Sequence, residues 1–340
     1  MSIRRFLFRH QLFFISALLV FAAIVAEIVL HHEPLPAYIA DLIMVQAADA
    51  FAHQPSADLQ LLYELKPNSR NVYKTPHQPP RVVTVNNLGL RDPLRSIKKA
   101  PGVFRIIILG SSTTYGAAVN DNETLPVYLE KILNGEAPPG RKYEVWNAGV
   151  SAYTPMQMAA LGRRLIGWGC EPDVMLFQIH LMGPRAFLWR SVDVRDFGLD
   201  HSLFAEHFYT PRWLGGVAAS LSARSRLILL LMSYYNRVIG AAKRKKLLDE
   251  ICLAHHQRAL RQFVRDFGGR IHLAALNMPC TNPADNFEPL RAAGPASLPV
   301  WCIYSDPNDP NALLLHPPPY IYEAWARQTG RMLNNHVGFR

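Results

Sequence analysis

The sequence predicts an α/β protein built on a doubly wound parallel sheet, with one transmembrane helix at its N-terminus. Three observations support this prediction: an uncharged apolar run near the N-terminus, a proline-rich region after it, and short apolar runs that alternate with helical periodicity beyond residue 100. Strands that alternate with helices at this spacing are typical of a parallel sheet that binds ligands at the carboxyl ends of its strands. A composition of 49% hydrophobic and 18% charged residues excludes intrinsic disorder for most of the chain.

The N-terminal apolar run has the length of a membrane span. No charge occurs from Leu12 to Ala26, and Ile28–Leu30 continues the run after Glu27. A helix of this length crosses a bilayer core of about 30 Å. Three arginines precede the run (Arg4, Arg5 and Arg9), which places the N-terminus in the cytoplasm and the bulk of the chain in the periplasm or outside the cell. A cleaved signal peptide is the alternative, but the run is long for one and lacks a clear A-x-A site, so we expect an uncleaved, single-pass anchor in the cell membrane.

The composition divides the chain into three regions. Residues 1–33 form the basic end and the anchor, and residues 34–100 form a proline-rich connector with a β-prone run at Val82–Val85. Residues 101–338 form the main domain, with an insertion at about 184–248. An apolar run within the insertion, Leu227–Met232, is too short to span a bilayer, so it is either a buried helix face or a surface that rests on the membrane.

Short continuous apolar runs in the main domain indicate strands that are buried on both faces. Strands are expected at residues 104–109, 143–146, 174–179, 270–276 and 300–304. Helical periodicity is found at residues 125–133, 156–168, 250–267 and 320–334.

Charge and cysteine patterns exclude several classes of partner. The net charge is +10, but the basic residues are dispersed and no nucleic-acid-binding motif accompanies them, so we expect no nucleic-acid partner. The densest basic group, Lys243–Lys246, is either a solvated face or a contact with anionic lipid. The four cysteines lack C-x-x-C spacing, and the histidine pairs at 31–32 and 255–256 lack ligand partners at useful spacing, so neither a metal nor a cofactor is expected. In an oxidising compartment Cys280 and Cys302 are the most plausible disulfide, with buried free thiols as the alternative.

A hydroxyl-rich turn directly follows the first strand: Gly110-Ser111-Ser112-Thr113-Thr114-Tyr115-Gly116. A serine at the tip of a strand-to-helix turn presents its Oγ as a nucleophile, close to backbone N–H groups. An ordinary serine or threonine N-cap is the alternative interpretation. The turn is not a G-x-S-x-G elbow, because Thr114 replaces the last glycine, and no Gly-Lys-Ser/Thr follows to make a phosphate-binding loop.

Gly110-x-Ser112-x-Thr114-x-Gly116 resembles the first sequence block of SGNH (GDSL-type) hydrolases, and Val145–Ser151 resembles the second. Residues 63–68 and 85–91 resemble the lead-in of membrane-anchored members of that family. The resemblance implies a three-layer SGNH or flavodoxin-like sandwich, with Ser112 as nucleophile and His316 as its base. It further implies an oxyanion hole that includes the backbone amides of Ser112 and Gly149.

The later blocks depart from the family pattern. Met182 stands where the family has an asparagine that donates to the oxyanion; His180 is a substitute donor or a core residue. Leu313 stands where the acid partner of His316 is expected. Asp309, or Asp306 further upstream, is the candidate partner if its loop folds back to the imidazole; without one, His316 is a less well oriented base.

Two functions remain open at this point. One is an extracytoplasmic, membrane-anchored esterase, acetylesterase or acyl-transfer enzyme that acts on cell-envelope carbohydrate or lipid. The other is a catalytically inactive SGNH-fold subunit that scaffolds or binds a protein partner within a membrane-associated complex.

Overall fold

The structure is a computed structural model, and it describes most of the chain outside the predicted insertion. The described residues are 3–32, 52–58, 60–61, 63–75, 78–151, 153–179, 225–228, 230–231, 253–280, 298–312, 314 and 316–338. The chain divides into two compact units. Unit 1 comprises Met1–Gln46 and Leu188–Arg244, and unit 2 comprises Ala47–Phe187 and Lys245–Arg340. Most of the predicted insertion, including the basic run at 243–246, lies outside the described residues.

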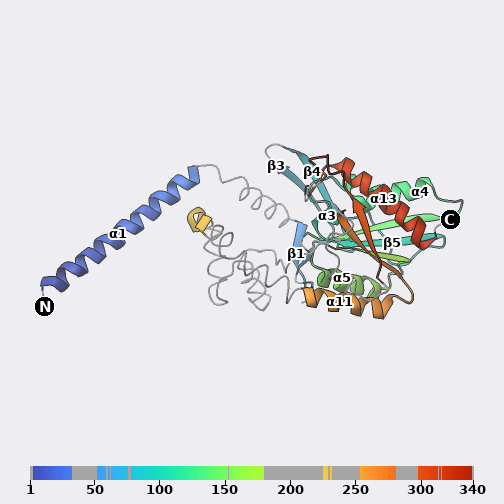
Figure 1. Cartoon of the computed structure of the whole chain (residues 1–340), viewed down its shortest axis with the longest axis horizontal. Coiled ribbons are helices and arrows are strands. Elements are labelled where there is room, and N and C mark those ends of the chain that lie inside the picture. The colour runs from blue at the N-terminus through green and yellow to red at the C-terminus, as the bar shows by residue number, and fades with distance from the viewer. Residues whose placement is uncertain are drawn as a thin grey trace. The chain divides into compact units, whose positions relative to one another are not determined.

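Helix α1 (Ile3–His32) is the main described element of unit 1 (Figure 1). Its stretch Phe13–His32 has a mean hydropathy of 2.7, is not buried, and is long and apolar enough to cross a membrane. The predicted apolar helix is therefore present, although length and composition alone also fit a signal sequence.

A five-stranded parallel sheet forms the centre of unit 2. Its strands are β5 (Val103–Gly110), β6 (Lys142–Gly149), β7 (Val174–Gln178), β8 (His272–Cys280) and β9 (Val300–Tyr304). Their order, β6-β5-β7-β8-β9, starts near the middle and extends in both directions, which defines a doubly wound sheet. All five predicted strands are present, and the predicted fold class is confirmed.

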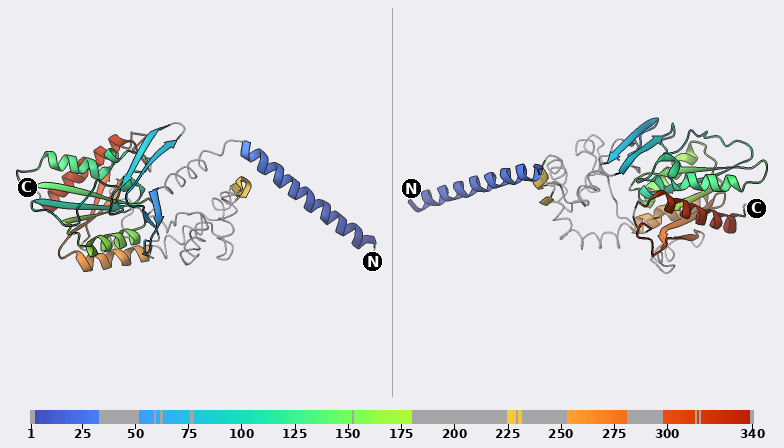
Figure 2. Two further views of the ribbon diagram at one scale, coloured as in Figure 1. Left: turned by 180° about the vertical axis from the view of Figure 1, so that it is seen from behind. Right: turned by 90° about the horizontal axis from the view of Figure 1, so that it is seen from above.

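Two pairs of helices cover the two faces of this sheet (Figures 1 and 2). Helices α4 (Leu125–Gly135) and α13 (Pro319–Val337) contact each other on one face. Helices α5 (Pro155–Gly167) and α11 (Leu253–Phe267) contact each other on the other face. The sheet residues between the two layers are fully buried, which explains why the strands appear in the sequence as continuous apolar runs.

The predicted connector contributes four strands to unit 2. Strands β1 (His53–Pro55) and β2 (Tyr63–Leu65) pair antiparallel, as do β3 (Ser69–Thr75) and β4 (Gln78–Val85), the second of which contains the predicted β-prone run. Beyond them, the Arg91 guanidinium donates to the carbonyl oxygens of Tyr115, Gly116 and Val119. Arg91 therefore bonds the lead-in directly to the last two residues of the serine turn and to the chain that follows it.

Cys280 and Cys302 are thiols, so the disulfide considered from the sequence is absent and the free-thiol alternative holds. The Asn277 side-chain amide lies 3.7 Å from the Cys280 Sγ and 4.0 Å from the Cys302 Sγ.

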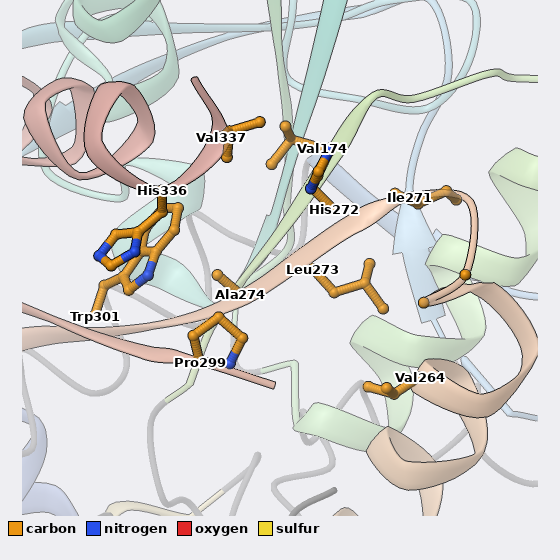
Figure 3. Close-up of a pocket in the computed structure, with 12 residues that line it drawn as sticks. Val174, Val264, Ile271, His272, Leu273, Ala274, Pro299, Trp301, His336 and Val337 are labelled. Carbon is orange, nitrogen blue, oxygen red and sulfur yellow. The ribbon is translucent and has the colours of Figure 1, made fainter. Parts of the chain in front are cut away.

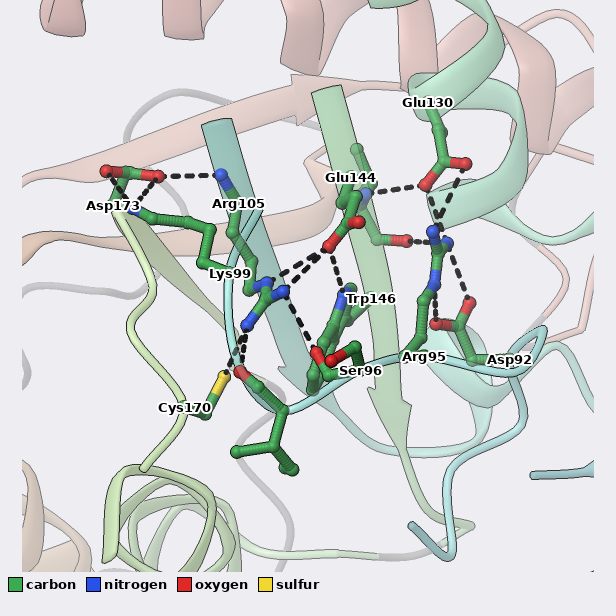
Figure 4. Close-up of polar contacts among 12 residues, drawn as sticks. Asp92, Arg95, Ser96, Lys99, Arg105, Glu130, Glu144, Trp146, Cys170 and Asp173 are labelled. Atoms are coloured by element: carbon green, nitrogen blue, oxygen red, sulfur yellow. Dashed lines mark hydrogen bonds and ion pairs between the residues drawn. The ribbon is translucent and has the colours of Figure 1, made fainter. Parts of the chain in front are cut away.

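A buried charged cluster supports the amino ends of the central strands (Figure 4). The Arg105 guanidinium donates to the carbonyl oxygens of Ile97 (2.6 Å) and Ser96 (3.0 Å) and forms a 3.0 Å ion pair with Glu144. It also lies 4.4 Å from the centre of the Trp146 ring. The Asp173 carboxylate accepts from the Arg105 backbone N–H at 2.7 Å. Arg105 therefore joins the end of the connector, at residues 96 and 97, to two adjacent strands, and nothing in the sequence pattern indicates this role.

We expect Arg105→Met to lower the free energy of unfolding by about 3 kcal/mol, because it removes the positive partner of Glu144 and the donor to two carbonyl groups. Arg163→Met is the matched control. Arg163 also pairs with a carboxylate, Asp266, and lies against a ring, Phe263, but its ion pair is partly exposed. Its substitution is expected to cost less than about 1 kcal/mol. Urea unfolding of the detergent-solubilised chain measures both values, and equal losses would contradict the role given to Arg105.

Candidate active site

Ser112 begins the short helix α3 (Ser112–Tyr115) directly after β5, at the carboxyl edge of the sheet. The turn is tight: a Cβ atom on Gly110 would lie 2.0 Å from the Thr114 Oγ1, so only glycine fits there. The helix ends at Gly116, whose φ of 84° is in the left-handed region that glycine adopts without strain. Ser112 is 8% exposed, and its Oγ makes no hydrogen bond within the described part of the chain. The geometry therefore presents a serine hydroxyl that the fold does not use.

Gly149 ends β6 and allows that strand to approach α3. A Cβ atom on Gly149 would lie 2.2 Å from the Tyr115 backbone nitrogen. The Gly149 N–H donates to the Asn147 Oδ1 at 3.0 Å. The amide that was expected to help form an oxyanion hole is therefore already hydrogen-bonded, and it could serve there only after leaving Asn147. The oxyanion roles of Gly149 and of the Ser112 amide stay predictions.

Gln178 is a site residue that the sequence reasoning missed. It lies at the end of β7, is fully buried, and its Oε1 accepts from the Ser111 N–H at 3.1 Å, the Ser111 Oγ at 3.2 Å and the Thr114 Oγ1 at 3.4 Å. Because the backbone N–H can only donate, it determines which end of the amide faces the turn. The Gln178 Nε2 is buried and has no hydrogen-bond partner within the described part of the chain. The available signal was one polar residue within the apolar run Val174–Ile179.

His316 precedes α13, as the sequence indicated, and is partly buried. Its Nε2 is buried and has no hydrogen-bond partner among the described residues, which include Ser112. Burial, and to a lesser extent the nearby positive charge of Arg81, together lower the pKa of the imidazole from 6.5 to about 4. The His316 imidazole is therefore neutral at physiological pH, and its Nε2 makes no hydrogen bond to a described residue.

Neither upstream aspartate is bonded to His316. The Asp309 Oδ2 accepts from the Tyr320 hydroxyl at 2.7 Å, and its Oδ1 accepts from the Asn311 N–H at 2.9 Å. These hydrogen bonds lower the pKa of Asp309, the one from Tyr320 most strongly. Asp306 similarly accepts from the Asn308 N–H at 2.9 Å. Each carboxylate therefore makes the local Asx-turn that aspartate favours, and the expected Asp309–His316 contact is not formed.

The structure therefore places Ser112, His316 and Asp309 in unit 2 but joins no two of them by a hydrogen bond. The other positions where the sequence departs from the family, His180, Met182 and Leu313, lie outside the described residues. Within the described ranges, no group of three or more histidine, cysteine, aspartate or glutamate side chains could hold a metal ion.

A cavity of ≈ 470 Å³ lies at the amino ends of β7, β8 and β9, far along the strands from Ser112 (Figure 3). Apolar side chains such as Val174 and Leu273 line it, together with Trp301, whose ring stacks on His336 at 5.3 Å between ring centres. Because Ser112 follows the carboxyl end of β5, this cavity is separate from the serine site.

The chain matches several solved structures of lipolytic enzymes and esterases. No protein-family model matches it, and no curated protein matches it. A proposed lipolytic protein of the G-D-S-L family from Desulfitobacterium hafniense is 12% identical, with 67% of this chain and 99% of that chain covered and a TM-score of 0.36. The lipase/acylhydrolase from Enterococcus faecalis is 13% identical, with 68% and 96% covered and a TM-score of 0.39. An acetylxylan esterase from Geobacillus stearothermophilus is 12% identical, with 69% and 95% covered and a TM-score of 0.37.

These names agree with the family that the sequence blocks resemble. At such identities and TM-scores the matches assign no role to any residue of this chain.

We expect Gly149→Ala to destabilise unit 2 by about 1–3 kcal/mol, because the added methyl group collides with backbone atoms of α3 that cannot rotate away. Gly167→Ala is the control: a Cβ atom at this end of α5 meets nothing within 4 Å. Chemical unfolding compares the two variants. A Gly149→Ala chain as stable as Gly167→Ala would show that β6 and α3 are not in tight contact.

We expect His316 to make stability depend on pH between about 6.5 and about 4. In this window the unfolded chain binds a proton at His316 and the folded chain does not, so stability is lost as pH falls, by roughly 3 kcal/mol below pH 4. A His316→Phe variant cannot bind the proton and should lose less stability over the same window. The measurement is the difference between the two unfolding free energies as a function of pH; a constant difference would contradict the buried, neutral imidazole.

Proposed function

We propose that this chain is a membrane-anchored, extracytoplasmic serine hydrolase of SGNH type, with Ser112 as its nucleophile. The observation that supports it best is the position of the Ser112 hydroxyl. It lies at the carboxyl edge of a parallel sheet, on a turn that requires glycine at position 110, and makes no hydrogen bond to a described residue. An ordinary N-cap would use its hydroxyl to accept from the helix backbone, whereas Ser112 lies inside the first turn of α3 and Ser111 occupies the N-cap.

The proposed reaction is acyl transfer through a serine ester. The Ser112 Oγ attacks the carbonyl carbon of an ester while the neutral His316 accepts its proton, which requires the two side chains to come within hydrogen-bond reach. The backbone N–H at Ser112 is suited to donate to the oxyanion. The proton then passes from His316 to the departing alkoxide. Water, or an acceptor hydroxyl in an acyl-transfer enzyme, regenerates Ser112 by the reverse sequence.

The proposed location restricts the substrate class. If Phe13–His32 crosses the membrane with the N-terminus in the cytoplasm, unit 2 is tethered outside it, where esters of envelope carbohydrate and of lipid are within reach. An acetyl or longer acyl ester on such a polymer or lipid is therefore the proposed substrate.

A non-catalytic role is the second candidate, and the state of His316 favours it. Its imidazole has no carboxylate partner among the described residues, and its low pKa makes it a weak proton acceptor. In this second candidate function the SGNH-like unit binds or scaffolds a protein partner within a membrane-associated complex. Ser112 then has no catalytic role.

Labelling with a fluorophosphonate probe decides between the two candidates. We expect the full-length chain in detergent to be labelled covalently, Ser112→Ala to lose the label by more than about 100-fold, and His316→Ala to slow labelling. Ser96→Ala is the control for a substitution that leaves the turn untouched. Labelling that survives in Ser112→Ala would exclude Ser112 as the nucleophile, and absence of labelling from the unsubstituted folded chain would support the scaffold.

A further inference from the structure

Glu27 is an anionic side chain inside the apolar stretch of α1. It lies within Phe13–His32, five residues before the end of the helix, or about 8 Å at about 1.5 Å per residue. A charged residue within a membrane span is costly and usually has a partner. Glu27 therefore identifies a place where another part of the chain should meet the anchor.

Within α1, the His31 Nε2 lies 3.1 Å from the Glu27 Oε1, and a distant segment of the same unit supplies three further contacts. The Glu27 Oε1 accepts from the Arg226 N–H at 2.8 Å, and its Oε2 accepts from the Leu227 N–H at 3.0 Å and the Ser225 Oγ at 2.8 Å. Residues 226–228, 230 and 231 are helical, so the carboxylate caps the first turn of this segment. The segment is the short yellow ribbon near the C-terminal end of α1 in Figures 1 and 2.

Arg226 also binds the last turn of α1. Its guanidinium donates to the carbonyl oxygen of Leu30 at 2.6 Å and to that of His31 at 3.4 Å. These carbonyl groups belong to the last turn of α1, where no intrahelical donor is available. A long basic side chain that reaches from the apolar level toward the end of a span is the usual position of arginine near a membrane surface.

We propose that residues 225–231 form a second membrane contact, which lies in the lipid interface beside the C-terminal end of α1. This inference rests on the proposed anchor. If Glu27 lies about one and a half turns inside the span, its hydrogen-bond donors lie at the same depth. The residues that follow them, Leu227 to Leu231, are all apolar in sequence.

Lipid is the occupant that these observations favour. Leu231 is 58% exposed, and the apolar side chains of α1, such as Ile28 (55%), are exposed as well. Arg226 adds a positive charge at the level where anionic head groups lie. A short apolar helix with a basic residue at its edge is suited to lie in the interface rather than to cross the bilayer.

The test places an environment-sensitive bimane label on Leu231→Cys in the full-length chain, reconstituted in vesicles with and without doxyl-labelled lipid. We expect the lipid to quench this label at least about twofold more than a label on Leu94→Cys, an exposed leucine of unit 2. The unsubstituted chain gives the background from native cysteines. In Glu27→Leu, which keeps the span apolar but removes the acceptor, quenching at Leu231→Cys is expected to fall to the Leu94→Cys level.

Alkaline carbonate extraction of the same vesicles tests the anchor separately. If the chain is extracted, the proposed anchor fails and the second contact fails with it. If the chain is retained but Leu231→Cys is quenched no more than Leu94→Cys, a protein surface covers the segment and the inference alone is overturned. Quenching that persists unchanged in Glu27→Leu would overturn the role of Glu27 in holding the segment.

Discussion

The close approach of β5, β6 and α3 is the contact on which the serine site depends. Gly110 and Gly149 pair side by side at the carboxyl ends of neighbouring strands, and each lies where a methyl group would collide with α3. Gln178, from the strand on the other side of β5, accepts from the Ser111 N–H at the start of the turn. Three adjacent strands therefore hold one turn. The Ser112 hydroxyl on this turn makes no hydrogen bond to a described residue.

Local sequence pattern predicted the fold well because parallel strands buried on both faces leave continuous apolar runs, and because glycine is required at the tip of β5. The same pattern could not identify Gln178 or Arg105, since their partners lie 67 and 39 residues away in the chain. Asp309 shows a different limit. Its position before α13 was compatible with reaching His316, but a local Asx-turn and the Tyr320 hydroxyl compete for the same carboxylate, and spacing alone could not decide between them.

His316 shows why position and chemistry must be considered separately. Burial keeps its imidazole neutral, which is the state that accepts a proton, but the same burial penalises the imidazolium that would then form. A carboxylate behind the ring normally offsets that penalty, and neither Asp306 nor Asp309 does so here. Ester hydrolysis by this chain therefore requires a change around His316 when substrate binds, whereas a binding role requires none.

Arg105 and Glu27 obey one physical rule in two settings. Each places a charge among apolar groups: the Arg105 side chain is 1% exposed near the amino end of β5, and Glu27 lies within the apolar stretch of α1. Such a charge is tolerated only if backbone and side-chain groups surround it, so it determines where distant segments must lie. Arg105 brings residues 96 and 97 to the central strands, and Glu27 brings residues 225–227 to α1. In both cases a residue that looks unfavourable in its own segment is explained by a segment far away in the sequence.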